Sequence, residues 1–280
     1  YPMIIAIAVN VVNILLSMFF VFILKMKSEG VALGTAISQY FGLLIAILLF
    51  LKRYKFLLFR ISKKGILNLK ILIEFFRVNS DIFIRTFCII AVFTFFTSKS
   101  ASESDTILAV NSLLIQLLLF FSFFIDGFAF AGEALVGKFV GAKQPENLKK
   151  VIKLLFYWGT GLAIIFTLLY LPGVNFILKI LTSQHEVINA AQPFLFWVIL
   201  VPAASFASFI WDGIYIGATA SKAMRNALIG ATFLVFVPVY YLLNPLWGNH
   251  SLWLGMILFM LSRGLIQTFI YRQAILKPIL

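Results

Sequence analysis

Two carboxylates stand alone inside long apolar stretches of this 280-residue chain. Neither Asp126 nor Asp212 has a lysine or arginine within four residues on either side. In surroundings of low dielectric constant such a group favours its neutral form, so it can take up and release a proton. It can also coordinate a sodium ion with nearby hydroxyl and carbonyl oxygens. Both residues are therefore candidates for ion coupling, unless each meets a lysine or backbone group of a neighbouring helix and only holds helices together.

Three further charges follow one another at intervals of four residues. Arg77, Asp81 and Arg85 would lie on one stripe of a helix, because residues four apart share a face. The stripe is either a charge network that faces a cleft or a neutralised ion pair that holds spans together. Arg85 is the only cation that we expect well inside a span.

Small polar residues mark the first two apolar stretches. Asn10, Asn13 and Ser17 lie in the first stretch, and Thr35 lies in the second. Polar groups of this size commonly join adjacent membrane helices by hydrogen bonds. The same residues could line a polar cleft, so we keep all four as candidates.

Eight apolar stretches must position these side chains. They cover residues 2–24, 31–51, 77–98, 106–132, 154–178, 187–211, 226–249 and 251–271. About 20 helical residues cross the ~30 Å of hydrocarbon in a bilayer. The sequence therefore predicts an all-α integral membrane protein, a polytopic bundle of eight transmembrane helices. Pro193, Pro202 and Pro238 predict kinks in two of them.

The composition excludes a water-soluble fold. Hydrophobic residues make up 62% of the chain, charged residues 12%, and the mean hydropathy is +1.04, so lipid must surround most of the apolar side chains. The net charge of +13 would suggest nucleic acid as a partner of a soluble protein. Here the cations lie in the loops, where they meet headgroups, and we expect no nucleic-acid partner.

The loop charges predict the orientation of the helices. Cations gather in 52–70, 138–153, 222–225 and 272–277, whereas the alternate loops hold only Lys25, Lys27, Lys99 and Lys179. The first set should be cytoplasmic, which places both ends of the chain in the cytoplasm. We expect a multi-pass protein of the plasma (inner) membrane.

Other chemistries find no support in the sequence. Cys88 is the only cysteine, and His185 and His250 fall in different loops, so we expect neither a disulfide nor a metal site. The chain has no serine, histidine and aspartate set and no phosphate-binding loop, which argues against an enzyme. The first span opens at Pro2 without a basic region before it, so we expect an internal fragment.

The helix count favours a 2 + 6 organisation. Residues 1–51 would be the remnant of an N-terminal lobe, 52–70 a basic cytoplasmic linker, and 71–280 a C-terminal lobe of six helices. The repeated pairs Asp126-Gly127 and Asp212-Gly213, on helices that run in the same direction, hint at internal duplication.

Several runs resemble one known family. They are Asn10-Val11-Val12-Asn13-Ile14, Gly30-Val31-Ala32-Leu33-Gly34-Thr35, Asp81-Ile82-Phe83-Ile84-Arg85-Thr86, Ile125-Asp126-Gly127-Phe128-Ala129, Trp211-Asp212-Gly213-Ile214-Tyr215 and Met224-Arg225-Asn226. Their order and spacing are similar to helices five to twelve of the multidrug and toxic compound extrusion (MATE) family, in its DinF-like branch.

The resemblance implies a secondary active efflux antiporter. It implies two six-helix lobes around a cleft, and alternating access that exports drugs or metabolites in exchange for H⁺ or Na⁺. The coupling ion would be the only cofactor, the substrate lipophilic or cationic, and the full-length protein a monomer. In many relatives an aspartate stands four residues after the matching asparagine, where this chain has Ser17.

Two alternatives remain open. A lipid-linked oligosaccharide flippase of the same superfamily would need a strongly cationic cleft, and Arg85 alone does not provide one. A non-transporting membrane scaffold would leave Asp126 and Asp212 unexplained.

Overall fold

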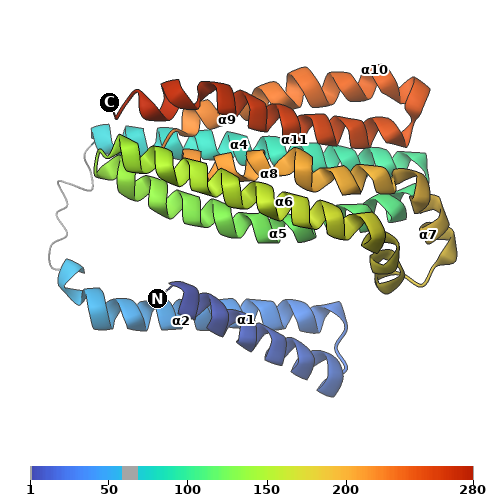
Figure 1. Ribbon diagram of the computed structural model, residues 1–280. Coiled ribbons are helices and arrows are strands. Elements are labelled where there is room, and N and C mark those ends of the chain that lie inside the picture. The colour runs from blue at the N-terminus through green and yellow to red at the C-terminus, as the bar shows by residue number, and fades with distance from the viewer. Residues whose placement is uncertain (1, 59–68, 280) are drawn as a thin grey trace. The chain divides into compact units, whose positions relative to one another are not determined.

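A computed structural model describes the chain over residues 2–58 and 69–279, and these residues are helical with short turns between helices (Figure 1). Eight helices of the described residues are long and apolar enough to cross a membrane. The predicted all-α fold with eight transmembrane helices is confirmed. The chain divides into two compact units, Tyr1–Ile73 and Glu74–Leu280.

The first unit is a helical hairpin. Helix α1 (Pro2–Met18) passes into the π-helical segment η1 (Phe19–Ile23), and a short turn leads to α2 (Ser28–Leu58). The two helices approach closely at Gly34, where an added Cβ would lie 2.9 Å from the Ser17 hydroxyl oxygen. Helix α2 continues to Leu58, so residues 52–58 of the predicted linker are helical. The rest of the predicted linker lies mostly outside the described residues.

The second unit holds the other six spans. They are formed by α4 (Leu69–Glu103), α5 (Asp105–Gly141), α6 (Pro145–Leu181), α7 (His185–Ala191) with η2 (Gln192–Phe194) and α8 (Leu195–Gly217), α9 (Ser221–Gly230) with η3 (Ala231–Phe236) and α10 (Val237–Trp247), and α11 (Asn249–Tyr271) with η4 (Arg272–Leu276). The chain leaves α-helical geometry at Pro193 and immediately before Pro238. Helix α8 continues through Pro202.

Glycine sets the distance between α5 and α8. A Cβ on Gly213 would collide with the carbonyl oxygen of Ala129, and one on Gly217 with that of Glu133. Small residues of this kind let membrane helices pack backbone to backbone. The contact matters for the site, because Asp212 is adjacent to Gly213 and Asp126 lies less than one turn from Ala129.

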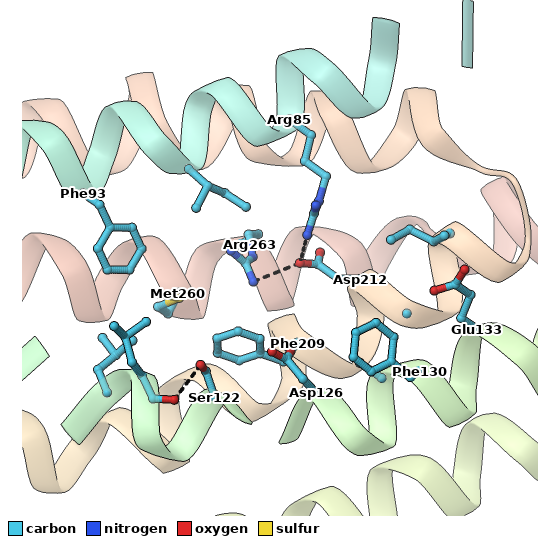
Figure 2. A pocket seen from close by; sticks show the side chains of 16 residues that line it. Arg85, Phe93, Ser122, Asp126, Phe130, Glu133, Phe209, Asp212, Met260 and Arg263 are labelled. Carbon is cyan, nitrogen blue, oxygen red and sulfur yellow. Dashed lines mark hydrogen bonds and ion pairs between the residues drawn. The ribbon is translucent and has the colours of Figure 1, made fainter. Parts of the chain in front are cut away.

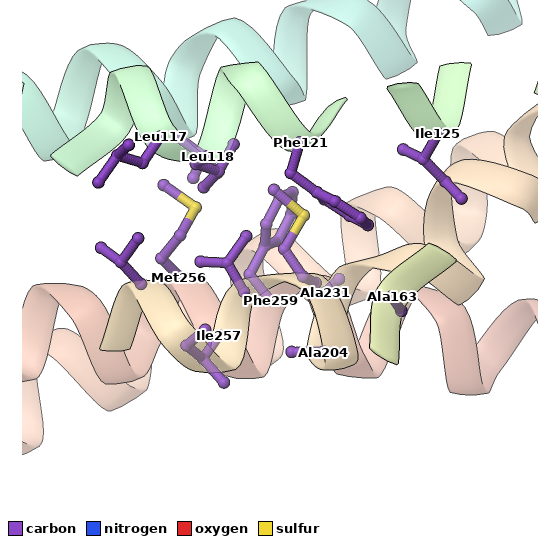
Figure 3. Close-up of a cluster of buried hydrophobic side chains, with 14 of the residues drawn as sticks. Leu117, Leu118, Phe121, Ile125, Ala163, Ala204, Ala231, Met256, Ile257 and Phe259 are labelled. Carbon is purple, nitrogen blue, oxygen red and sulfur yellow. The ribbon is translucent and has the colours of Figure 1, made fainter. Parts of the chain in front are cut away.

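A continuous apolar core fills the second unit. Leu117, Leu118, Phe121 and Ile125 project from α5, and Figure 3 shows the first three on the side of Met256 and Phe259 of α11 and Ile125 toward Ala163 of α6. A buried polar cluster joins α4, α5 and α11 near one end. There Asn111 donates to Ser100 Oγ at 2.6 Å and to Asn249 Oδ1 at 2.7 Å, and its own Oδ1 accepts from Trp253 Nε1 at 2.9 Å.

Candidate functional site

A cavity of about 360 Å³ opens inside the second unit, between α4, α5, α8 and α11 (Figure 2). Its walls are mainly apolar and include Phe93, Phe130, Phe209 and Met260. Five charged residues of the described chain line it: Arg85, Asp126, Glu133, Asp212 and Arg263. Ionisable groups at such a depth are costly unless they are paired or functional, so each needs an account.

Asp212 is fully engaged. Its Oδ2 accepts from the guanidinium of Arg85 on α4 and, at 3.2 Å, from that of Arg263 on α11, and its Oδ1 accepts from Gln267 Nε2 at 3.2 Å. The side chain of Asp212 is 9% exposed. Asp212 therefore meets cations of neighbouring helices, the alternative that the sequence left open, although they are arginines and not a lysine.

Arg263 is the residue that the sequence interpretation missed. It lies well inside α11 with only 2% of its surface exposed, so Arg85 is not the only cation inside a span. Its guanidinium also donates to Ser208 Oγ at 3.0 Å and lies 5.6 Å and 5.7 Å from the ring centres of Phe209 and Phe259. In the sequence Arg263 is a single charge in an otherwise apolar stretch, and such a charge requires a partner of opposite sign.

Asp126 contrasts with Asp212. It lines the same cavity from α5 and is half-buried, yet within the described residues it makes neither a hydrogen bond nor an ion pair. Glu133, seven residues later on α5, also faces the cavity, and in the view of Figure 2 Phe130 lies between the two carboxylates. As far as the described residues extend, the cavity thus contains one neutralised carboxylate and two without an ion pair.

Asp81 belongs to a different place. It is 3% exposed and accepts from Arg225 Nη1 at 2.5 Å and from Ser221 Oγ at 3.0 Å, both on α9. Arg77 and Asp81 line a second pocket of about 420 Å³, away from the first cavity. The stripe on α4 is therefore no ion pair within one helix, because Asp81 pairs with α9 and Arg85 with α8.

The candidates of the first unit join its two helices. Asn13 Nδ2 donates to Thr35 Oγ1 at 3.1 Å and to Ser38 Oγ at 3.3 Å, and Ser17 Oγ donates to Asn13 Oδ1 at 3.5 Å. Asn10 takes no part in this network and lines a separate pocket beside Gln39. These contacts fit the helix-joining interpretation of Asn13 and Thr35, whereas the hydrogen bond of Ser17 stays within α1.

No group of three or more histidine, cysteine or acidic residues that could hold a metal ion occurs in the part of the chain that the structure describes. Cys88 is buried and free. The absence of a cofactor other than a coupling ion stays a prediction.

A model of the MatE family matches residues 82–242, which is more than half of the chain. The chain belongs to the MATE family. It is 31% identical to DNA damage-inducible protein F of Escherichia coli over 97% of its own length. It is 24% identical to Protein DETOXIFICATION 42 of Arabidopsis thaliana over 91%. The MATE chain spans 59% of the first relative and 48% of the second.

Solved structures support the same fold. The Vibrio cholerae MATE transporter VcmN in its bent form matches 99% of this chain with a TM-score of 0.81 at 17% identity, and the chain covers 62% of it. The eukaryotic MATE transporter AtDTX14 matches 99% of this chain with a TM-score of 0.81 at 15% identity, and the chain covers 64% of it. At these identities the two structures, both of MATE transporters, show the fold alone. The family-model match and the eight apolar helices make the MATE chain a multi-pass membrane protein of this family.

Proposed function

We propose that this chain is part of a longer secondary active exporter that exchanges its substrate for H⁺ or Na⁺ by alternating access. The observation that carries the proposal is Asp126, a carboxylate in a cavity inside a membrane unit that has no ion-pair partner among the described residues. A half-buried carboxylate without an ion pair favours a bound proton or cation, so its occupancy can respond to an ion gradient. A non-transporting scaffold has no use for this arrangement.

The two aspartates then have different roles. Asp126 is the coupling residue, while Asp212 organises the cavity by fixing Arg85 and Arg263. From the sequence both residues were candidates for ion coupling, and the ion pairs of Asp212 now separate them. Asp81 fastens α4 to α9 and does not reach the cavity.

The substrate should be lipophilic or cationic. Three carboxylates and two guanidiniums line the cavity, which leaves it negative when all are ionised, and aromatic rings supply the remaining wall. Aromatic faces and carboxylates together suit an organic cation. A lipid pyrophosphate would meet this net negative charge, because both arginines are already engaged by Asp212, and this disfavours the flippase alternative.

Transport by the full-length protein tests the proposal. Purified transporter in proteoliposomes should move a fluorescent lipophilic cation against its gradient when a proton or sodium gradient is imposed. The same vesicles with both gradients collapsed by ionophores serve as the control. Equal movement with and without the gradients would rule out a secondary active exporter.

The orientation is a separate prediction, drawn from the loop charges. In a Cys88→Ser background, His185→Cys should react with a membrane-impermeant maleimide added outside the cell, whereas Lys149→Cys should react only after the membrane is permeabilised. Both positions are exposed at helix ends, so accessibility within the protein is matched. Labelling of Lys149→Cys in intact cells would invert the topology and place both chain ends outside.

A further inference from the structure

We propose that the guanidinium of Arg85 fills the place of a monovalent cation in the cavity of the second unit, so that removing Arg85 opens a cation site at Asp212. The inference rests on the proposed function but concerns a different carboxylate. It makes Arg85 a tethered counter-ion, which excludes free cations from Asp212 and leaves Asp126 as the place where they bind.

The surroundings of Asp212 are those of a small cation. Besides the carboxylate itself, Ser208 Oγ and the side-chain amide of Gln267 lie in the same cluster, since Arg263 contacts both Ser208 and Asp212, and Gln267 donates to Asp212. Gln267 Oε1 is buried and has no hydrogen-bond partner in the described part of the chain. Carboxylate, hydroxyl and amide oxygens are the ligands that hard cations prefer, and a buried oxygen without a partner is an unmet need for one.

The two arginines are not equivalent. Arg263 is held on several sides, by Ser208, by Asp212 and by the rings of Phe209 and Phe259. Among the described residues Arg85 has one anchor, Asp212, and its side chain is 16% exposed compared with 2% for Arg263. Arg263 is therefore held in place by several contacts, and Arg85 is the guanidinium that a free cation can replace.

Helix α4, which carries Arg85, also packs differently from its neighbours. Its backbone approaches the rest of the second unit less closely than α8 approaches α5, α6 and α11. Side chains hold it instead, through Asp81 with Arg225, Arg85 with Asp212 and Ser100 with Asn111. Loss of the Arg85 contact thus leaves two polar anchors on α4, so an Arg85 variant should still fold.

The charges that line the cavity explain why a cation should bind when Arg85 is removed. With Arg85 present, two guanidiniums face three carboxylates; without it, Arg263 faces Asp126, Glu133 and Asp212 by itself among the described residues that line the cavity. The added negative charge in a region of low dielectric constant must be compensated, and oxygen ligands beside Asp212 offer a place for the compensating ion.

Sodium-dependent melting of the purified full-length transporter tests the inference. Arg85→Gln should gain a rise in melting temperature of about 3 °C between choline chloride and sodium chloride of equal ionic strength, beyond any shift of the wild type. Arg85→Lys keeps the positive charge and should show no gain. Arg225→Gln, which breaks an ion pair outside the cavity, should show none either.

Double variants show which carboxylate binds the ion. The sodium-dependent rise in melting temperature should persist in Arg85→Gln/Asp126→Asn and vanish in Arg85→Gln/Asp212→Asn. If the gain follows pH at constant choline chloride instead of sodium, a proton has taken the place of Arg85, and the same two double variants must still separate Asp212 from Asp126.

Two results would overturn the inference. One is a folded Arg85→Gln protein whose melting gains no dependence on sodium or pH. The other is a gain that is lost with Asp126→Asn and kept with Asp212→Asn. Neither result bears on efflux by the wild type, and failure of efflux would not remove a cation site exposed by Arg85→Gln, so the two proposals fail separately.

Discussion

Asp212→Asn should lower the free energy of unfolding by about 3 to 5 kcal/mol, because it leaves the buried guanidinium of Arg263 and the partly exposed one of Arg85 without their carboxylate. Asparagine keeps the size of the side chain and can still accept from Gln267, so the loss would reflect charge and not packing. Arg263 is the more affected partner, since it is 2% exposed and cannot turn to water. The expected reading is a fall of about 10 °C in the melting temperature of the full-length protein in detergent.

The matched control for Asp212→Asn is Asp126→Asn, the same change in the same cavity at a carboxylate that pairs with no arginine of the described residues. It should alter stability by less than about 1 kcal/mol, in line with ordinary substitutions away from ion pairs. Arg85→Gln/Asp212→Asn should recover part of the loss, because one of the two stranded charges is gone. An Asp212→Asn protein that melts like the wild type would show that its contacts with both arginines are dispensable.

Asp126→Asn should instead reduce gradient-driven efflux by about ten- to hundredfold, as expected for loss of a charged group that binds an ion or substrate. The protein should insert and melt normally, because Asp126 has no hydrogen bond or ion pair to lose within the described residues. Efflux is measured in proteoliposomes at equal protein content, with the proton and sodium gradients imposed separately. The gradient that no longer drives transport in the variant identifies the coupling ion.

Asp105→Asn is the control for this experiment. It makes the same chemical change on the same helix, at an exposed position in the first turn of α5. Efflux by Asp105→Asn should match the wild type. Wild-type efflux by Asp126→Asn, with unchanged dependence on both gradients, would remove Asp126 from the coupling step.

The helices could be predicted from the sequence because hydropathy is a local property. Their ends could not, since helices extend beyond the hydrocarbon: α4 begins at Leu69, before the apolar stretch 77–98, and α5 continues to Gly141 beyond residue 132. In those extensions the polar ends of helices still satisfy their backbone hydrogen bonds, so polarity alone does not end a helix.

The partners within the site could not be predicted in the same way. Asp212 and Arg85 are separated by 127 residues, and no local pattern shows that α4 and α8 meet at that level. Isolated charges in apolar stretches were visible at Arg85, Asp126, Asp212 and Arg263, and their need for compensation was a usable rule. The rule does not say which charges pair, because that depends on how the helices pack and at what depth each charge lies.

The close contact of Gly213 and Gly217 with the carbonyl groups of α5 has a consequence for any conformational cycle. Two helices that interlock through their backbones cannot slide or rotate against each other without separating, so α5 and α8 must travel as a single rigid block. Asp126 and Asp212 then keep the same relative position throughout the cycle. Any rearrangement must then occur at helices that contact this block mainly through side chains, as α4 does.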